Sequence, residues 1–327
     1  MFIKSLELKN YRNYEELSMS FSEGTNLLYG DNAQGKTNIL ESIYLAATTK
    51  SHRGSKDREM IRFHADEAHI RIHYQKKDIG HQLDMHLKKN RSKGAAIDQI
   101  PIRRSSDLLG QIPIIFFSPE DLKIIKNGPS ERRKFMDLEL SQLESLYLYY
   151  LSKYNKILMQ RNNLLKQIRF QESLMDTLEA WDIQLVKYGS EIIRYRKDFI
   201  MHLNQIIRKI HKRLTGNQEE ICIEYENSVE YDSFLTELTK KRSVDLKYAT
   251  TNVGPHRDDI RFMVNDIDIR KFGSQGQQRT AALSLKLAQI QLVREILKDS
   301  PILLLDDVLS ELDSSRKIYL LEGIKDI

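Results

Sequence analysis

The chain has 327 residues, 40% of them hydrophobic and 30% charged, and its 51 Lys+Arg against 46 Asp+Glu give a formal net charge of +5. This length is enough for two lobes with buried cores, and the small positive excess permits nucleic-acid binding without requiring it. The single cysteine, Cys222, excludes a disulfide within these residues and fits a reducing cytoplasm. No apolar run approaches the roughly 20 residues that span a bilayer, which argues against a membrane protein.

Two strands are predicted at residues 2–8 and 17–21, where apolar side chains alternate with polar ones. The two strands are separated by the run Asn10-Tyr11-Arg12-Asn13-Tyr14. The guanidinium of Arg12 could contact a nucleotide or a DNA phosphate, but a surface arginine in a turn fits the composition as well.

A phosphate-binding loop is indicated by Gly30–Thr37, which has the form G-x-x-x-x-G-K-[ST] between a strand-like run, Thr25–Tyr29, and a helix-like run, Asn38–Tyr44. The glycines let backbone N–H groups point at one anion, and the helix adds its positive dipole end. Lys36 would reach the β- and γ-phosphates of a nucleoside triphosphate, and Thr37 would hold Mg²⁺. The expected nucleotide-binding residues here are Gly30, Asn32, Gly35, Lys36, Thr37 and Asn38. A glycine turn with an accidental Lys-Thr pair is the alternative.

Short alternating runs at residues 68–74 and 82–87 predict strands of a small antiparallel sheet, followed by a basic hairpin turn at Lys88–Gly94. Such a turn could follow a phosphate backbone, although many charge runs are only solvated. The candidate DNA contacts are Arg53, Lys88, Lys89, Arg91 and Lys93.

A continuous apolar run at Ile112–Phe117 predicts a buried strand, after which the chain becomes helical. Periodic apolar positions predict one long helix from Pro129 to about Ile168 and a second from about Leu178 that stops near Thr215. The two should form an antiparallel hairpin whose tyrosine stripe is better explained by packing than by base stacking. Further strands are predicted at residues 221–225, 260–264 and 267–269.

Two carboxylates follow the apolar strand Pro301–Leu305. Asp306 is expected to hold Mg²⁺ either through its water shell or together with Thr37, and Asp307 to orient and deprotonate the attacking water. A helix cap is the alternative reading of this Asp-Asp pair.

A second anion site is predicted where Ser274 and Gly276 precede the helical stretch Thr280–Leu297. Two such sites cannot easily serve one nucleotide from the same side. We therefore expect a two-fold dimer in which each nucleotide lies between the phosphate loop of one chain and the Ser274 loop of the other.

These motifs resemble, in order and over nearly the whole chain, those of the RecF family within the ABC-type ATPases. The matching stretches are Leu6–Tyr14, Gly30–Asn38, Ser118–Leu122, Gly254–Asp259, Gly273–Arg279 and Leu305–Asp313. The resemblance implies an ATP-binding signature at Ser274, Gly276 and Gln277, and a loop at residues 310–313 that crosses a dimer interface. It also implies a longer chain beyond Ile327 and slow hydrolysis without it.

The resemblance further implies a cytoplasmic protein that binds ATP and Mg²⁺, dimerises on ATP, and binds double- and single-stranded DNA at gaps. Its implied partners are RecR and RecO, which help to load the recombinase RecA. A metabolic P-loop kinase would have no use for the Ser274 loop, and a structural arm protein would carry a coiled coil of hundreds of residues, which is not present.

The predicted fold class is α/β: an ABC-type P-loop ATPase head whose first lobe has a mixed sheet, joined to a helical second lobe. We expect lobe I to comprise residues 1–121 plus 251–327, and lobe II residues 122–250. The signature loop and its helix, residues 273–297, should lie at the lobe boundary.

Overall fold

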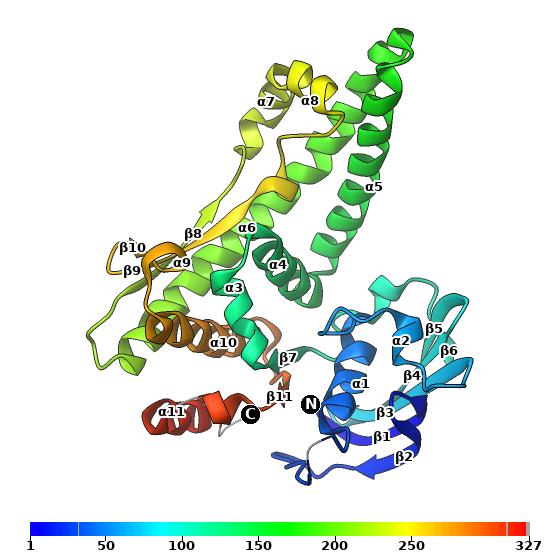
Figure 1. The fold of residues 1–327 in the computed structure, drawn as a ribbon, viewed down its shortest axis with the longest axis vertical. Helices are drawn as coiled ribbons and strands as arrows, with labels where there is room; N and C mark the ends of the chain where they lie inside the picture. Colours follow the sequence, from blue (N-terminus) through cyan, green and yellow to red (C-terminus); the bar gives the residue numbers. More distant parts are fainter. Residues whose placement is uncertain (32, 312, 325–327) are drawn as a thin grey trace. The chain divides into compact units, whose positions relative to one another are not determined.

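The computed structural model describes residues 1–31, 33–311 and 313–324, and these form two compact units (Figure 1). The first unit contains residues 1–119 and 293–327, and the second contains residues 120–292. The α/β character expected from the sequence is confirmed. The division differs from our expectation at residues 251–292, which group with the second unit because β9 (Asp259–Val264) pairs along its length with β8 (Ile221–Glu226).

An antiparallel six-stranded sheet with the order β2-β1-β3-β4-β5-β6 dominates the first unit. Its strands are β1 (Phe2–Tyr11), β2 (Tyr14–Ser20), β3 (Glu67–Lys76), β4 (Ile79–Lys88), β5 (Arg91–Ile97) and β6 (Ile100–Pro101). Strict alternation gives the sheet two faces, since on β3 Ile70 and Ile72 are fully buried while His69 and Arg71 face outward. Helix α1 (Lys36–Thr48) covers the buried face (Figure 1).

A second, two-stranded sheet in the same unit joins distant parts of the chain in parallel. It pairs β7 (Ile114–Phe117) with β11 (Ile302–Leu305), and Leu305 lies opposite Phe117. The remaining helices of this unit are α2 (Asp57–Met60) and α11 (Ser314–Ile324), while α10 (Gln275–Leu297) runs from the second unit into the first.

The strand predicted at Thr25–Tyr29 is wrong. None of the described strands pairs with these residues, and Leu27 and Tyr29 are 80% and 89% exposed. An apolar run becomes a strand only when a neighbour supplies its hydrogen bonds.

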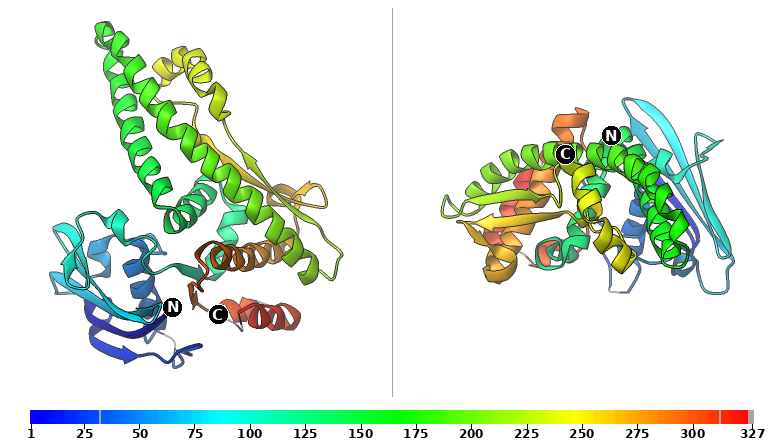
Figure 2. Two further views of the ribbon diagram at one scale, coloured as in Figure 1. Left: turned by 180° about the vertical axis from the view of Figure 1, so that it is seen from behind. Right: turned by 90° about the horizontal axis from the view of Figure 1, so that it is seen from above.

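The second unit is built on the helices α4 (Pro129–Leu143), α5 (Ser145–Ile168) and α6 (Leu178–Leu214). The single long helix expected up to Ile168 is interrupted at Glu144, whose extended backbone (φ −132°, ψ 103°) separates α4 from α5. The antiparallel hairpin of α5 and α6 is confirmed, as Figure 2 shows from behind. The shorter elements are α3 (Leu122–Lys126), α7 (Phe234–Lys240), α8 (Arg242–Tyr248), β10 (Ile267–Asp268) and α9 (Ile269–Phe272).

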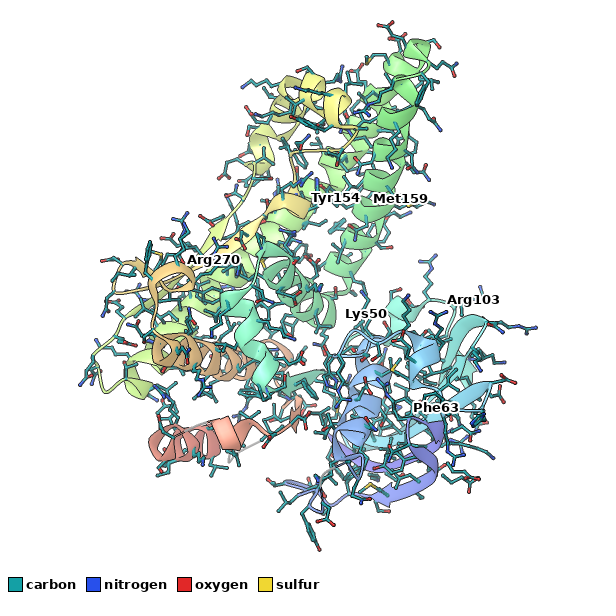
Figure 3. All side chains as sticks on the ribbon, viewed as in Figure 1. Lys50, Phe63, Arg103, Tyr154, Met159 and Arg270 are labelled. Atoms are coloured by element: carbon teal, nitrogen blue, oxygen red, sulfur yellow. The ribbon has the colours of Figure 1, made fainter. Side chains whose placement is uncertain are left out.

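The two faces of α5 differ in their exposure to solvent. Tyr154 is 1% exposed and its hydroxyl lies 2.6 Å from Nδ1 of His256, whereas Met159 on the opposite side is 55% exposed (Figure 3). A buried charge cluster fixes the hairpin to α8, because Arg161 contacts Asp182 at 2.6 Å and Asp245 at 2.7 Å with no side chain of the three exposed. Of the tyrosine-rich stripe, Tyr147 and Tyr154 are buried in the core of this unit and Tyr188 and Tyr195 pack against it, which supports a packing role.

The loop at residues 254–259 is also bound to the helices of this unit. Asp259 accepts two hydrogen bonds from Arg132 of α4, at 2.6 and 3.0 Å. Arg196 of α6 donates to the carbonyl oxygen of Pro255 at 2.6 Å. Burial lowers the pKa of His256 to about 4, so this imidazole is neutral at physiological pH.

A buried carboxyl makes the stability of the second unit depend on pH. Glu139 of α4 is 3% exposed, and burial raises its pKa to about 7 although Lys286 and Gln289 of α10 oppose the shift. The folded chain thus keeps a proton that the unfolded chain releases near pH 4.5. Stability from this group is present below the unfolded pKa and is lost as the pH rises towards 7.

We predict that Glu139→Gln stabilises the protein more at pH 8 than at pH 5, by about 2–3 kcal/mol. The neutral amide never has to bury a charge. Urea unfolding of both proteins at both pH values gives the difference, in which the titration of all other groups cancels. An equal effect of the substitution at pH 5 and pH 8 would contradict the assignment.

Candidate nucleotide-binding site

Lys36, the first residue of α1, contacts the backbone at the start of the phosphate loop. The ammonium of Lys36 donates to the carbonyl oxygens of Gly30 and Asp31, both at 2.7 Å. Gly30 and Gly35 have φ angles of 140° and 94°, a region that glycine enters without strain. The first turn of α1 follows this loop directly in the chain. An anion bound by the loop would therefore lie at the positive end of the helix dipole.

The two predicted metal ligands meet although 269 residues separate them, since Oγ1 of Thr37 donates to Oδ1 of Asp306 at 3.0 Å. The position of Asp306 follows from the parallel sheet, because its amide donates to the carbonyl oxygen of Phe117 at 2.9 Å, one residue after β11 ends. A hydroxyl and a carboxylate are oxygen donors of the kind Mg²⁺ prefers, and neighbouring ligands of octahedral Mg²⁺ lie roughly 2.9 Å apart. The residues present therefore fit Mg²⁺.

A cation held in this way would need further oxygen ligands. Within the described ranges, no group of three or more His, Cys, Asp or Glu side chains is arranged to hold a metal. For Mg²⁺ these further ligands would be water and the phosphates of a nucleotide.

Asp307 differs from its neighbour in backbone and exposure. Its φ is 51°, in the left-handed region that aspartate tolerates better than most residues, and its side chain is exposed while that of Asp306 is half-buried. The two adjacent carboxylates thus differ in environment, as separate roles require.

Arg12 is held in place mainly by a side chain of helix α1. Its Nε and Nη2 donate to the two carboxylate oxygens of Glu41, each at 2.8 Å, and it also donates to the hydroxyl of Ser55 and the carbonyl oxygen of Glu59. Although burial alone would raise the pKa of Glu41, hydrogen bonds from Arg12 and Ser51 hold it below its ordinary value. Arg12 therefore binds α1 to the β1–β2 turn.

The signature loop begins α10 with a reciprocal cap. Oγ of Ser274 accepts from the amide of Gln277 at 3.2 Å, and the side chain of Gln277 accepts from the amide of Ser274 at 3.0 Å. Among the described atoms outside the backbone of its own helix and its two chain neighbours, the nearest to a Cβ on Gly276 would be Oγ of Ser274 at 3.8 Å, so this helix start is not crowded there. Of the other predicted nucleotide-binding residues, Asn38 of α1 donates a hydrogen bond to Asn13. Asn32, and Leu312 in the predicted interface loop, lie outside the described residues.

The candidate DNA-contacting residues separate into two kinds. Lys93 is an anchor, because its ammonium donates to the carbonyl oxygen of Thr49 at 2.6 Å and to Asp57 at 2.8 Å. Lys89 and Arg91 are exposed at the β4–β5 turn, Arg53 is exposed on the loop after α1, and Lys88 is half-buried. Lys50 and Arg103 add exposed cations to this unit (Figure 3).

Sequence reasoning missed three residues of the site: Asn13, Tyr14 and Glu41. Asn13 and Tyr14 donate to the carbonyl oxygen of Gln34 in the phosphate loop, and Glu41 holds Arg12. The signal for Glu41 was an acidic residue that follows Ile39 and Leu40 and precedes Ile43 on the helix. Nothing in the sequence pattern indicates that the β1–β2 turn contacts the loop.

The chain is similar in sequence to a known family of proteins. A model described as an AAA domain matches residues 5–222. The DNA replication and repair protein RecF of Lachnoclostridium phytofermentans is 61% identical over 99% of this chain and 90% of its own, and that of Clostridium perfringens is 44% identical over 100% and 91%.

Solved structures of RecF and of Smc heads are also similar to this chain. A structure of the recombination mediator protein RecF with ATP, from the RecFOR pathway, is 37% identical, has a TM-score of 0.95, and is matched over 100% of this chain and 90% of its own. An Smc head bound to the winged-helix domain of ScpA is 16% identical with a TM-score of 0.59 over 100% and 86%, which shows a shared fold. Among the described helices, none is both long and apolar enough to cross a membrane. The chain belongs to the RecF family of DNA replication and repair proteins, and its fold is that of an ABC-type ATPase head.

Proposed function

We propose that this protein is an ATP-gated DNA-binding protein of recombinational gap repair, acting in the cytoplasm. The observation that carries the proposal is the hydrogen bond from Thr37 to Asp306, which brings together from two distant segments the residues that would hold Mg²⁺ beside a nucleotide. The RecF relative solved with ATP supports ATP as the nucleotide. Lys36 would bind the β- and γ-phosphates, and Thr37 and Asp306 would hold Mg²⁺, which neutralises the charge that develops on the phosphates.

ATP would act as a switch that controls assembly. Each nucleotide would be enclosed between the phosphate loop of one chain and the Ser274 helix start of a second copy, where Gly276 and Gln277 contribute. The dimer would bind double- and single-stranded DNA at gaps and junctions and, with RecR and RecO, assist the loading of RecA. Slow hydrolysis, with Asp307 as the base, would release it.

Ser274→Arg should leave ATP bound to the phosphate loop but prevent dimerisation, because a bulky cation replaces a small donor at the partner's γ-phosphate. The lost cap costs about 1 kcal/mol, so the variant should remain folded. Ser173→Arg, at an exposed position in the same unit, is the matched control. ATP binding by calorimetry and mass by light scattering separate the two effects. A Ser274→Arg protein that dimerises like the control would show that Ser274 is only a helix cap.

DNA affinity should fall steeply with salt and depend little on sequence, because phosphate contacts release counterions. Arg53→Ala, Lys89→Ala and Arg91→Ala should each reduce the slope of log K against log salt by about one. Lys77→Ala, in the turn between β3 and β4, should not change the slope. Titrations of a gapped duplex with ATP present would test this, and a salt-independent affinity would count against the proposal.

A further inference from the structure

The β1–β2 turn holds the phosphate loop at one backbone atom. Nδ2 of Asn13 and the hydroxyl of Tyr14 both donate to the carbonyl oxygen of Gln34, at 3.3 and 3.0 Å. Asn13 also accepts a hydrogen bond from Nδ2 of Asn38, in the first turn of α1, at 2.8 Å. Two consecutive residues of the turn therefore contact both the loop and the helix that follows it.

The fit between the turn and the loop is close enough to require glycine. A Cβ atom on Gly35 would lie 2.7 Å from Nδ2 of Asn13 and 2.7 Å from the hydroxyl oxygen of Tyr14, which is shorter than van der Waals contact. The turn is held from its other side as well, because Arg12 makes a bidentate contact with Glu41 of α1. These contacts determine where the Gln34 carbonyl points.

The direction of that carbonyl sets the direction of the next amide. A trans peptide unit is planar, with its C=O and N–H groups on opposite sides. When Asn13 and Tyr14 hold the oxygen of Gln34, the N–H of Gly35 must point away from the turn. Gly35 immediately precedes Lys36, so this amide belongs to the set that would face the phosphates.

We propose that Asn13 and Tyr14 are positioning residues that orient the Gln34–Gly35 peptide for nucleotide binding. They do not touch the nucleotide, and they act through the amide of Gly35. We expect these hydrogen bonds to hold the peptide before ATP binds, so that binding does not have to order it. The inference rests on the proposed nucleotide site.

The test compares Tyr14→Phe and Asn13→Ala with the parent and with Tyr74→Phe. The control loses a hydroxyl from a buried residue of β3, in the same unit but without a contact to the loop. Each positioning variant should weaken ATP binding about two- to tenfold, the value of one net hydrogen bond, and the double variant should weaken it further. Amide hydrogen exchange in residues 30–40 should be faster in both variants without nucleotide, with an unchanged urea midpoint for Tyr14→Phe.

Lys36→Ala, measured beside these variants, separates the two levels of the argument. Unchanged affinity and unchanged hydrogen exchange in both positioning variants, with weakened binding in Lys36→Ala, would overturn the positioning role alone. Unchanged affinity with a lowered urea midpoint would show that the two residues only stabilise the fold, which also overturns it. If Lys36→Ala binds ATP like the parent, the nucleotide site itself is misplaced and the positioning role is overturned with it.

Discussion

Lys36→Ala should lose about ten- to 150-fold in ATP affinity, equivalent to roughly 1.5–3 kcal/mol for one charge-assisted contact. The ammonium donates to two carbonyl oxygens of the loop that would hold the phosphates, both at 2.7 Å. A phosphate oxygen is a stronger acceptor than a carbonyl oxygen because it carries charge. Calorimetric titration with ATP and Mg²⁺ gives the affinity directly.

The control for Lys36→Ala is Lys50→Ala, which removes an exposed lysine shortly after α1 ends (Figure 3). It changes the net charge by the same amount but removes no loop contact. Equal ATP affinity in the two variants would mean that Gly30–Thr37 is a glycine turn and not a nucleotide site.

Asp307→Asn should slow single-turnover hydrolysis by about 10²–10⁴-fold while ATP binding is retained, because the amide keeps the shape of the carboxylate but cannot accept a proton from water. The dimer should then persist on DNA after ATP is diluted away. Asp306→Asn is the matched comparison: it should weaken Mg²⁺ binding, and with it both dimerisation and hydrolysis, since Asp306 contacts Thr37.

The lifetime of the dimer after dilution, set beside the rate of hydrolysis, distinguishes these roles. An Asp307→Asn dimer that dissociates as fast as the parent, with hydrolysis unslowed, would exclude Asp307 as the base. The exposed carboxylate would then serve the local turn, consistent with its positive φ.

The parts of the site that could be predicted are those encoded in adjacent residues. A phosphate loop is a local motif, and an acidic pair after an apolar strand must lie at the end of that strand, so Thr37 and Asp306 could be matched before the sheet was known. The strand order places them in contact, because β11 pairs in parallel with β7.

The features that the sequence pattern does not specify concern contacts between distant residues. Lys93 and Arg91 look alike in a basic run, but Asp57 and Thr49 engage only Lys93, and no local pattern shows which lysine will meet them. The run Thr25–Tyr29 has the composition of a strand but no described partner. The break at Glu144 carries neither proline nor glycine, so helical periodicity continues across it.

The compact units of the structure differ from our expected lobes for the same reason. Residues 251–292 follow the helical region and lead to the Asp306 strand, which suggested that they belonged with the phosphate loop. Their cross-strand neighbours decide otherwise, since β9 lies between β8 and β10 in a three-stranded sheet of the second unit. Sheet pairing is a tertiary property that alternation alone does not specify.

The mass of the protein in solution, measured by light scattering without nucleotide, with ADP, and with ATP and Mg²⁺, tests the central claim most directly. We expect the mass to double only with ATP and Mg²⁺, and to remain that of one chain for Lys36→Ala under the same conditions. A parent protein that is saturated with ATP but keeps the mass of a single chain would contradict an ATP-gated dimer.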